Sequence, residues 1–249
     1  MKLMNKNWSF VVLADPELRS LGNGKPPGIG MFRKTLARIN VLKPQPEFMI
    51  LLGDIHVEKL RGLLPEIGLP VHVVHGNHET LSERKKLRNL FAKDFQGRDF
   101  YSFKHRKSLF IGLCTAASKD HVGHFESQTI TPQVGQCRWI EEQLRAGRRH
   151  HHTFVFGHIP PAPKGRSHDM SLGRNDSLFL LDAVRRHKPT ALFFGHLHRQ
   201  TFFKASGAPV YILRSCWDNY DAEPPGFLHV KISPKKASYE FILTETTKS

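Results

Sequence analysis

Polar side chains that can bind a divalent cation follow five short apolar runs of this sequence. Each of these side chains offers an oxygen or nitrogen donor atom. A glycine precedes most of them and permits close backbone approach and unusual dihedral angles. The apolar runs are residues 11–14, 49–53, 72–76, 153–157 and 192–195. The polar residues that come after them are Asp15, Asp54, Asn77, His158, His196 and His198.

Each of these positions, taken alone, has an ordinary structural explanation. Asp15 precedes Pro16, and this pair is typical of turns, because proline fixes its own φ and aspartate can bind nearby backbone. His196 and His198 are two residues apart and could share one face of a strand. Independent turns explain poorly why such residues follow so many apolar runs of one chain. We therefore predict that they form a joint metal site.

The elements that must position these residues are predicted as strands alternating with helices. Runs of strand length, rich in β-branched and aromatic residues, occupy residues 9–14, 47–53, 71–76, 109–114, 152–157 and 191–195. In an α/β sheet, the loops at the carboxyl ends of the strands gather in one crevice. That arrangement would bring the polar residues together.

Helices are predicted at residues 32–40, 131–144 and 175–189. The second begins with Thr131 as a candidate N-cap and Pro132 at the first helical position. The third begins with possible caps and ends at Pro189, with basic residues in its last turn. After Gly195 the chain predicts short strands without helices, which we interpret as a β-meander. Two packed sheets with helices on their outer faces are expected.

Length and composition favour a single domain over residues 1–249. With 39% hydrophobic residues and neither linker nor repeat, the chain can bury one large core. We expect no signal sequence and no membrane span, because no apolar run approaches the roughly 20 residues required. Cys114, Cys137 and Cys216 are far apart and odd in number, which favours a reduced, cytoplasmic protein.

The charge balance is strongly basic. Lys and Arg number 37 against 22 Asp and Glu, a net charge of +15, which attracts phosphate esters, nucleic acid or acidic lipid. The basic runs at residues 83–88, 104–107 and 148–152 are, taken singly, typical of solvated surfaces. Charge alone therefore predicts non-specific nucleic-acid binding. No nucleic-acid-binding signature accompanies the basic runs.

Four motifs in a fixed order resemble those of the calcineurin-like metallophosphoesterase superfamily. They are "GD" ending at Asp54, "GNHE" at residues 76–79, "GH" ending at His158 and "GHLH" at residues 195–198. The resemblance implies a four-layer α/β/β/α sandwich with two central mixed β-sheets and two metal ions at their edge. "GHIPP" and the helix at residues 136–144 are more loosely similar to the class III cyclic-nucleotide phosphodiesterase branch.

The resemblance also implies a role for each motif residue. Asp54 would bridge both metals, Asn77, His158 and His196 would complete one, and Asp15 and His198 would serve the other. His78 would act beside the leaving group as an acid or charge stabiliser. The cofactors would be two divalent ions, Mn²⁺, Fe, Zn²⁺ or Mg²⁺, that generate a bridging hydroxide as the nucleophile and neutralise the phosphate oxygens.

One position departs from the family pattern. The first motif is usually Asp-x-His, and here it is Asp15-Pro16-Glu17. A carboxylate can coordinate where an imidazole did, and it favours harder ions such as Mn²⁺ over Zn²⁺. We predict that Glu17 is a ligand. The alternative is a turn residue that faces solvent.

Other polar residues are less specific. His56 and the run at residues 150–152 are interpreted as incidental. The basic loop with Lys164, Arg166, His168 and Arg174 could contact the substrate or be solvated.

Three functions remain open from the sequence. The first is a dimetal phosphohydrolase of small anionic esters, acting on phosphodiesters such as cyclic nucleotides. The second is a metal-dependent nuclease or phosphomonoesterase. The third is a non-catalytic binding module in which Glu17 marks a degenerate metal motif.

Overall fold

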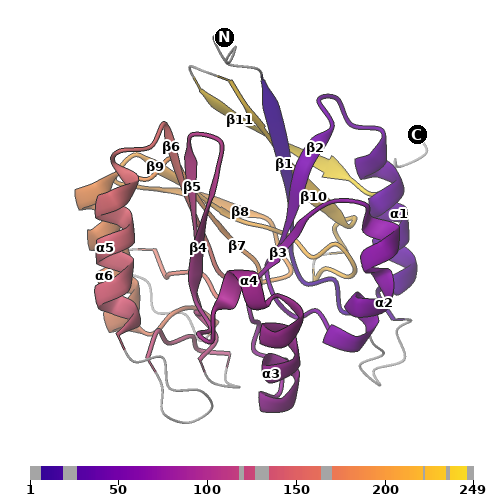
Figure 1. Ribbon diagram of the computed structural model, residues 1–249, viewed down its shortest axis with the longest axis horizontal. Helices are drawn as coiled ribbons and strands as arrows, with labels where there is room; N and C mark the ends of the chain where they lie inside the picture. The colour runs from indigo at the N-terminus through magenta and orange to yellow at the C-terminus, as the bar shows by residue number, and fades with distance from the viewer. Residues whose placement is uncertain are drawn as a thin grey trace.

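Two mixed β-sheets lie face to face at the centre of the computed structural model (Figure 1). The structure describes residues 7–18, 27–117, 121–126, 135–163, 170–220, 222–233 and 236–245. The first sheet has the order β11-β10-β1-β2-β3 and the second has the order β4-β5-β6-β7-β9-β8.

The strands of the first sheet are β1 (Trp8–Leu13), β2 (Pro46–Leu51), β3 (Val71–Val73), β10 (Gly226–Ile232) and β11 (Ala237–Leu243). Strands β1, β2 and β3 run parallel. The strands of the second sheet are β4 (Tyr101–His105), β5 (Ser108–Gly112), β6 (His152–Phe156), β7 (Ala191–Phe194), β8 (Thr201–Ala205) and β9 (Ala208–Ile212). Strands β5, β6, β7 and β9 run parallel, so their carboxyl ends share one edge.

Aromatic side chains fill the space between the sheets. The ring of Phe10, from the first sheet, has its centroid 5.2 Å from that of Phe110 and 5.3 Å from that of Phe154, both from the second sheet. All three side chains are fully buried. The two sheets therefore share one aromatic core, while the single domain over residues 1–249 stays a prediction.

Helices cover the outer faces of the two sheets (Figure 1). The helices are α1 (Ile29–Asn40), α2 (Val57–Ile67), α3 (Leu81–Leu90), α4 (Ala92–Phe95), α5 (Gln136–Gly147) and α6 (Arg174–His187). Helices α1 and α2 bury apolar side chains against the first sheet, and α5 and α6 against the second. The α/β sandwich with two mixed sheets is therefore confirmed. No helix in the described ranges is both long and apolar enough to cross a bilayer.

The last four strands do not form the predicted meander. Strands β8 and β9 pair as a hairpin in the second sheet, whereas β10 and β11 pair as a hairpin in the first. The chain crosses between the sheets where Ser215 forms a bridge with Ala14. Alternation of apolar residues predicts strands but does not reveal such a long-range pairing.

The predicted helix boundaries were partly right. Helix α6 begins at Arg174 after Gly173, and no side chain caps it. Helix α5 begins at Gln136 after Gly135, whose φ of +83° is left-handed. Thr131 and Pro132, the expected start of that helix, lie outside the described residues.

Candidate metal centre

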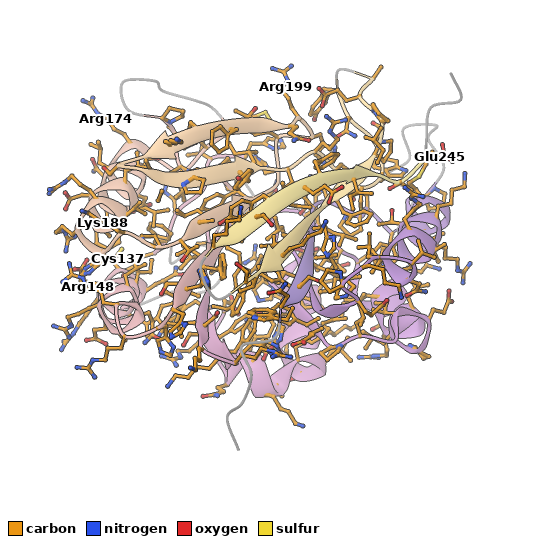
Figure 2. All side chains as sticks on the ribbon, turned by 90° about the horizontal axis from the view of Figure 1, so that it is seen from above. Cys137, Arg148, Arg174, Lys188, Arg199 and Glu245 are labelled. Atoms are coloured by element: carbon orange, nitrogen blue, oxygen red, sulfur yellow. The ribbon has the colours of Figure 1, made fainter. Side chains whose placement is uncertain are left out.

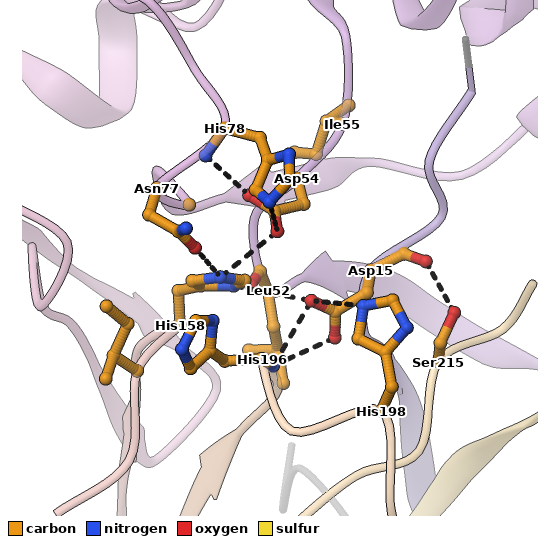
Figure 3. A network of polar contacts seen from close by, with 12 residues as sticks. Asp15, Leu52, Asp54, Ile55, Asn77, His78, His158, His196, His198 and Ser215 are labelled. Carbon is orange, nitrogen blue, oxygen red and sulfur yellow. Dashed lines mark hydrogen bonds and ion pairs between the residues drawn. The ribbon is translucent and has the colours of Figure 1, made fainter. Parts of the chain in front are cut away.

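The predicted ligands converge at the carboxyl ends of the strands (Figure 3). Donor atoms of Asp15, Asp54 and His158 all lie within 4.8 Å of one another. A second group with the same spacing consists of Glu17, Asp54 and His78. The buried members of the predicted set are Asp15, Glu17, Asp54, Asn77, His158 and His196. The structure therefore brings these residues together, while metal ligation itself stays a prediction.

Asp54 lies between the two groups. Its Oδ1 atom accepts a hydrogen bond of 3.1 Å from the backbone N–H of His78, and its Oδ2 atom lies 3.3 Å from Nε2 of His158. Asp54 has a φ of +53°, an unusual conformation for a residue other than glycine. Membership of both groups is what a bridging carboxylate requires.

Three histidines each point one ring nitrogen at a backbone carbonyl oxygen. The pairs are His158 Nδ1 with Leu52 O at 2.6 Å, His196 Nε2 with His121 O at 3.1 Å, and His198 Nδ1 with Asp218 O at 2.8 Å. A carbonyl oxygen only accepts, so the facing nitrogen carries a hydrogen and the other ring nitrogen is the one directed at the site. This is the usual way in which a protein orients histidines that bind metal.

Asp15 is held by the strand end that carries the last motif. Both carboxylate oxygens accept hydrogen bonds from the backbone N–H of His196, at 3.2 and 3.0 Å. A Cβ atom at Gly195 would lie 2.5 Å from Oδ2 of Asp15, and one at Gly76 would lie 2.0 Å from Oδ1 of Asp54. Only glycine permits these approaches, which explains the first residue of the "GNHE" and "GHLH" motifs.

Glu17 does not face solvent. Its side chain is buried, and its backbone N–H donates a 3.1 Å hydrogen bond to the carbonyl oxygen of Asp54. Its φ is +42°. The alternative that Glu17 is a turn residue facing solvent is therefore wrong. Metal ligation by Glu17 stays a prediction.

The metal-free site concentrates charge in a buried space. Burial, together with the negative charges of Asp54 and Asp15, raises the pKa of Glu17 to about 9. Burial also raises the pKa of Asp15. Burial opposes the charged form of His158, but the carboxylates of Asp54 and Asp15 outweigh it and raise its pKa to about 10. Crowded carboxylates that retain protons are a donor set that divalent cations fit, because cations would relieve the repulsion.

His196 is the member of the site that stays neutral. Burial, together with the positive charge of the neighbouring His158, lowers its pKa to about 3. A neutral imidazole is the form that binds metal.

Two buried residues that the sequence left without a role hold the "GNHE" loop. Glu79 accepts hydrogen bonds from the backbone N–H groups of Ile55 at 2.6 Å and Gly76 at 2.5 Å. Arg84 donates to the carbonyl oxygens of Glu79 at 3.2 Å, of Gly76 at 2.7 Å and of Ala116. Arg84 belongs to a basic run that we interpreted as solvated. Its helical spacing to the buried Leu87 was the available signal.

Thr115 also supports the site and has no signal in the sequence. Its Oγ1 atom accepts hydrogen bonds from the backbone N–H groups of His158 at 3.0 Å and Ile159 at 2.7 Å. His56 lies 3.9 Å from Glu83 and is in neither candidate group. Arg174 is exposed at the start of α6. Lys164, Arg166 and His168 lie outside the described residues.

A family model described as "Calcineurin-like phosphoesterase" matches residues 9–200. The chain belongs to this family. As a member, this protein is a metal-dependent phosphoric ester hydrolase, as its motifs imply. The resemblance inferred from the sequence is confirmed.

Relatives of this phosphoesterase carry two kinds of name. The human "Serine/threonine-protein phosphatase CPPED1" is 24% identical, with 86% of this chain and 73% of that protein covered. A Rhodopseudomonas palustris protein named "Probable cyclic nucleotide phosphodiesterase" is 26% identical, with 90% and 88% covered. A solved dimetal phosphatase from Danio rerio has the same fold, with a TM-score of 0.73, 16% identity and 96% of each chain covered.

Proposed function

We propose that this phosphoesterase hydrolyses phosphodiesters of small molecules, cyclic nucleotides among them. The observation that carries the proposal is the position of Asp54, which belongs to both candidate ligand groups. Two groups that share one carboxylate suit two adjacent cations rather than one.

The residues present fit two divalent ions. By the family resemblance, Asp54 would contact both ions, Asn77, His158 and His196 would complete one, and Asp15, Glu17 and His198 would complete the other. The two groups found by spacing share Asp54 but otherwise differ from this assignment, because Asp15 groups with His158 and His78 groups with Glu17. When bound, such ions lower the pKa of water and neutralise phosphate oxygens. Three carboxylates among the donors favour a hard ion, so we propose Mn²⁺.

His78 is placed to serve the leaving group. Its side chain is 38% exposed, unlike the buried ligands, and its Nε2 atom lies 4.0 Å from Oδ2 of Asp54. An imidazole on the open side of the site can hold a proton for a departing oxygen. This proposed role of His78 requires that its imidazole lie close to Asp54.

Tyr220 supports a substrate with a flat group. The side chain is 71% exposed, and its ring centroid lies 5.6 Å from that of His198. Its backbone N–H donates to the carbonyl oxygen of His198 at 3.3 Å. An exposed aromatic ring fixed beside the site can stack on a nucleobase. The relative named as a cyclic nucleotide phosphodiesterase supports the same substrate class.

A phosphomonoesterase is the second candidate. The relatives named as serine/threonine-protein phosphatases favour it, because that name implies a phosphomonoester substrate. Family membership and the assembled ligand set weigh against the non-catalytic module.

We also propose a cytoplasmic location, because Cys114, Cys137 and Cys216 are all free thiols.

A substrate panel separates these candidates. The Mn²⁺-loaded protein would be assayed on 2′,3′- and 3′,5′-cyclic nucleotides, bis(nitrophenyl) phosphate, nitrophenyl phosphate and a phosphoserine peptide. The proposal expects the highest kcat/KM on a cyclic nucleotide. Tyr220→Ala should raise KM for that nucleotide and leave the nitrophenyl esters less affected, with Tyr220→Phe as the matched control. Preference for the phosphopeptide would replace this proposal with the phosphomonoesterase.

A further inference from the structure

Five exposed cations lie at the opposite end of the second sheet from the metal centre. We call them the cationic edge: Lys107, Arg145, Arg148, Arg149 and Lys188. Lys107 lies in the turn between β4 and β5, and Arg148 and Lys188 are the C-caps of α5 and α6. Figure 2 shows Arg148 and Lys188 on the same side of the molecule, pointing away from it.

Hydrogen bonds hold the three segments of the cationic edge together. The backbone N–H of His151 donates to the carbonyl oxygen of Lys107 at 2.9 Å. The guanidinium of Arg148 donates to the carbonyl oxygen of Arg186 at 2.5 Å. Thr190 and Thr153 join the starts of β7 and β6 through a 2.7 Å backbone hydrogen bond. The cations therefore belong to one continuous surface.

The cationic edge carries more positive charge than its surroundings neutralise. No Asp or Glu occurs in residues 100–119, 143–168 or 183–217, and the nearest acidic residues on α5 are Glu141 and Glu142, one turn before Arg145. None of the ion pairs in the described ranges involves the five cations, while Arg185 and Arg186 beside them pair with Asp182. The C-termini of α5 and α6 contribute roughly half a negative charge each. The remaining charge is positive, so helix capping alone does not account for the cluster.

This surface is too far from the metal centre to bind the same small phosphate ester. His151 precedes β6 and His158 follows it. At about 3.3 Å per residue, the intervening strand separates the cationic edge from the ligands by about 20 Å. A ligand of this surface would therefore be a second anion, either larger than the phosphate ester or separate from it.

We propose that the cationic edge docks the phosphate backbone of a nucleic acid without reading its sequence. Three of the five cations are arginines, whose planar guanidinium groups match phosphate oxygens in bidentate geometry. A lipid surface fits less well, because insertion needs exposed apolar side chains. The large exposed hydrophobic residues of the described chain are Val41, Leu81, Leu178, Phe202 and Tyr220, and none belongs to the three segments.

Salt-dependent binding to a labelled oligonucleotide tests this proposal. The triple variant Arg148→Gln, Arg149→Gln, Lys188→Gln is compared with the control Lys59→Gln, Lys85→Gln, Lys93→Gln, which removes the same charge from exposed positions on α2, α3 and α4. The probe is a fluorescent strand of about 20 nucleotides, single or duplex, measured by anisotropy. Each lost phosphate contact lowers the slope of log K against log salt by about 0.7–0.9. The edge variant should lose about two units of slope and at least about tenfold in affinity at low salt.

Three results would overturn the proposal. Equal losses in both triple variants would mean that net charge alone attracts the strand. Wild-type protein that binds vesicles of phosphatidylserine and phosphatidylcholine but not the strand would indicate a membrane surface. Absence of strand binding at low salt would remove the docking role altogether. A cooperative melting transition, and hydrolysis of a nitrophenyl ester that is expected to be unchanged, show that the variants are folded.

Discussion

The Nε2 atom of His158 lies 3.3 Å from Oδ2 of Asp54, and both residues sit at the same strand edge although 104 positions separate them in the chain. Leu52, two residues before Asp54, supplies the carbonyl oxygen that accepts from Nδ1 of His158. One strand end thus provides both the carboxylate and the group that orients the imidazole. The pair holds together in the absence of metal because His158 is protonated and Asp54 is ionised.

The metal-free protein should become less stable as pH rises from 7.5 to 9, above the range in which the unfolded-state histidines titrate. Glu17 keeps its proton up to a pKa of about 9 when folded but releases it near 4.5 when unfolded. His158 keeps its proton up to about 10 when folded and only to about 6.5 when unfolded. In both cases the folded state binds more protons across the window, so unfolding becomes easier as pH rises. Urea unfolding after chelation measures this.

The matched variant for this pH effect is Glu17→Gln. It removes the titrating group at nearly constant volume, so its metal-free stability should fall less steeply between pH 7.5 and 9. A wild-type stability that rises over this window would contradict the assigned protonation states.

Glu17→His should change the preferred metal. Replacing the carboxylate by imidazole removes a negative charge and a hard donor, which shifts preference from Mn²⁺ toward Zn²⁺ or Fe. Glu17→Ala should weaken one metal and leave the other nearly intact. Elemental analysis and rates across a metal series test both variants. Two bound ions with unchanged preference and rate in both would mean that Glu17 is not a ligand.

His78→Ala should slow the hydrolysis of alkyl esters more than that of nitrophenyl esters. A positioned acid is worth roughly 10²–10⁴-fold when the leaving oxygen is basic, and less when it already leaves easily. Metal content should stay unchanged, because His78 is assigned to the leaving group. Kinetics on the two ester classes provide the comparison, and equal losses or loss of metal would argue for a different role.

Arg84→Met should destabilise the protein strongly. The substitution leaves the carbonyl oxygens of Gly76, Glu79 and Ala116 without their donor in a buried site. At about 1–3 kcal/mol for each unsatisfied group, the free energy of unfolding should fall by roughly 3–5 kcal/mol. Lys85→Met, on the exposed face of the same helix, is the control and should change it by less than about 0.5 kcal/mol. A comparable, small effect of both in urea unfolding would refute the role of Arg84.

The convergence of the candidate ligands was predictable because its signal is local. Asp54, Asn77 and His158 each follow an apolar run and a glycine, and parallel strands bring their carboxyl ends together. The resemblance to a known family then supplied the roles. The two-sheet architecture was predictable for the same reason, because strand-length runs alternate with helices.

The supporting residues were not predictable because their roles depend on distant partners. Arg84 lies among exposed cations in the sequence. Its side chain is buried because it packs against the "GNHE" loop, which lies outside helix α3. Thr115 acts through backbone groups 43 and 44 residues further on. The assignment of the last strands to two sheets likewise depends on a bridge between Ala14 and Ser215.

Metal content and turnover of the Asp54→Ala variant test the central claim most directly. The claim is that two divalent ions share Asp54 at the site of phosphoester hydrolysis. Wild-type protein, stripped with a chelator and reloaded with Mn²⁺, should bind two equivalents by elemental analysis and regain activity on bis(nitrophenyl) phosphate. Asp54→Ala should lose both ions and the activity while remaining folded by circular dichroism. An Asp54→Ala protein that retains two ions and full activity would contradict the dimetal assignment.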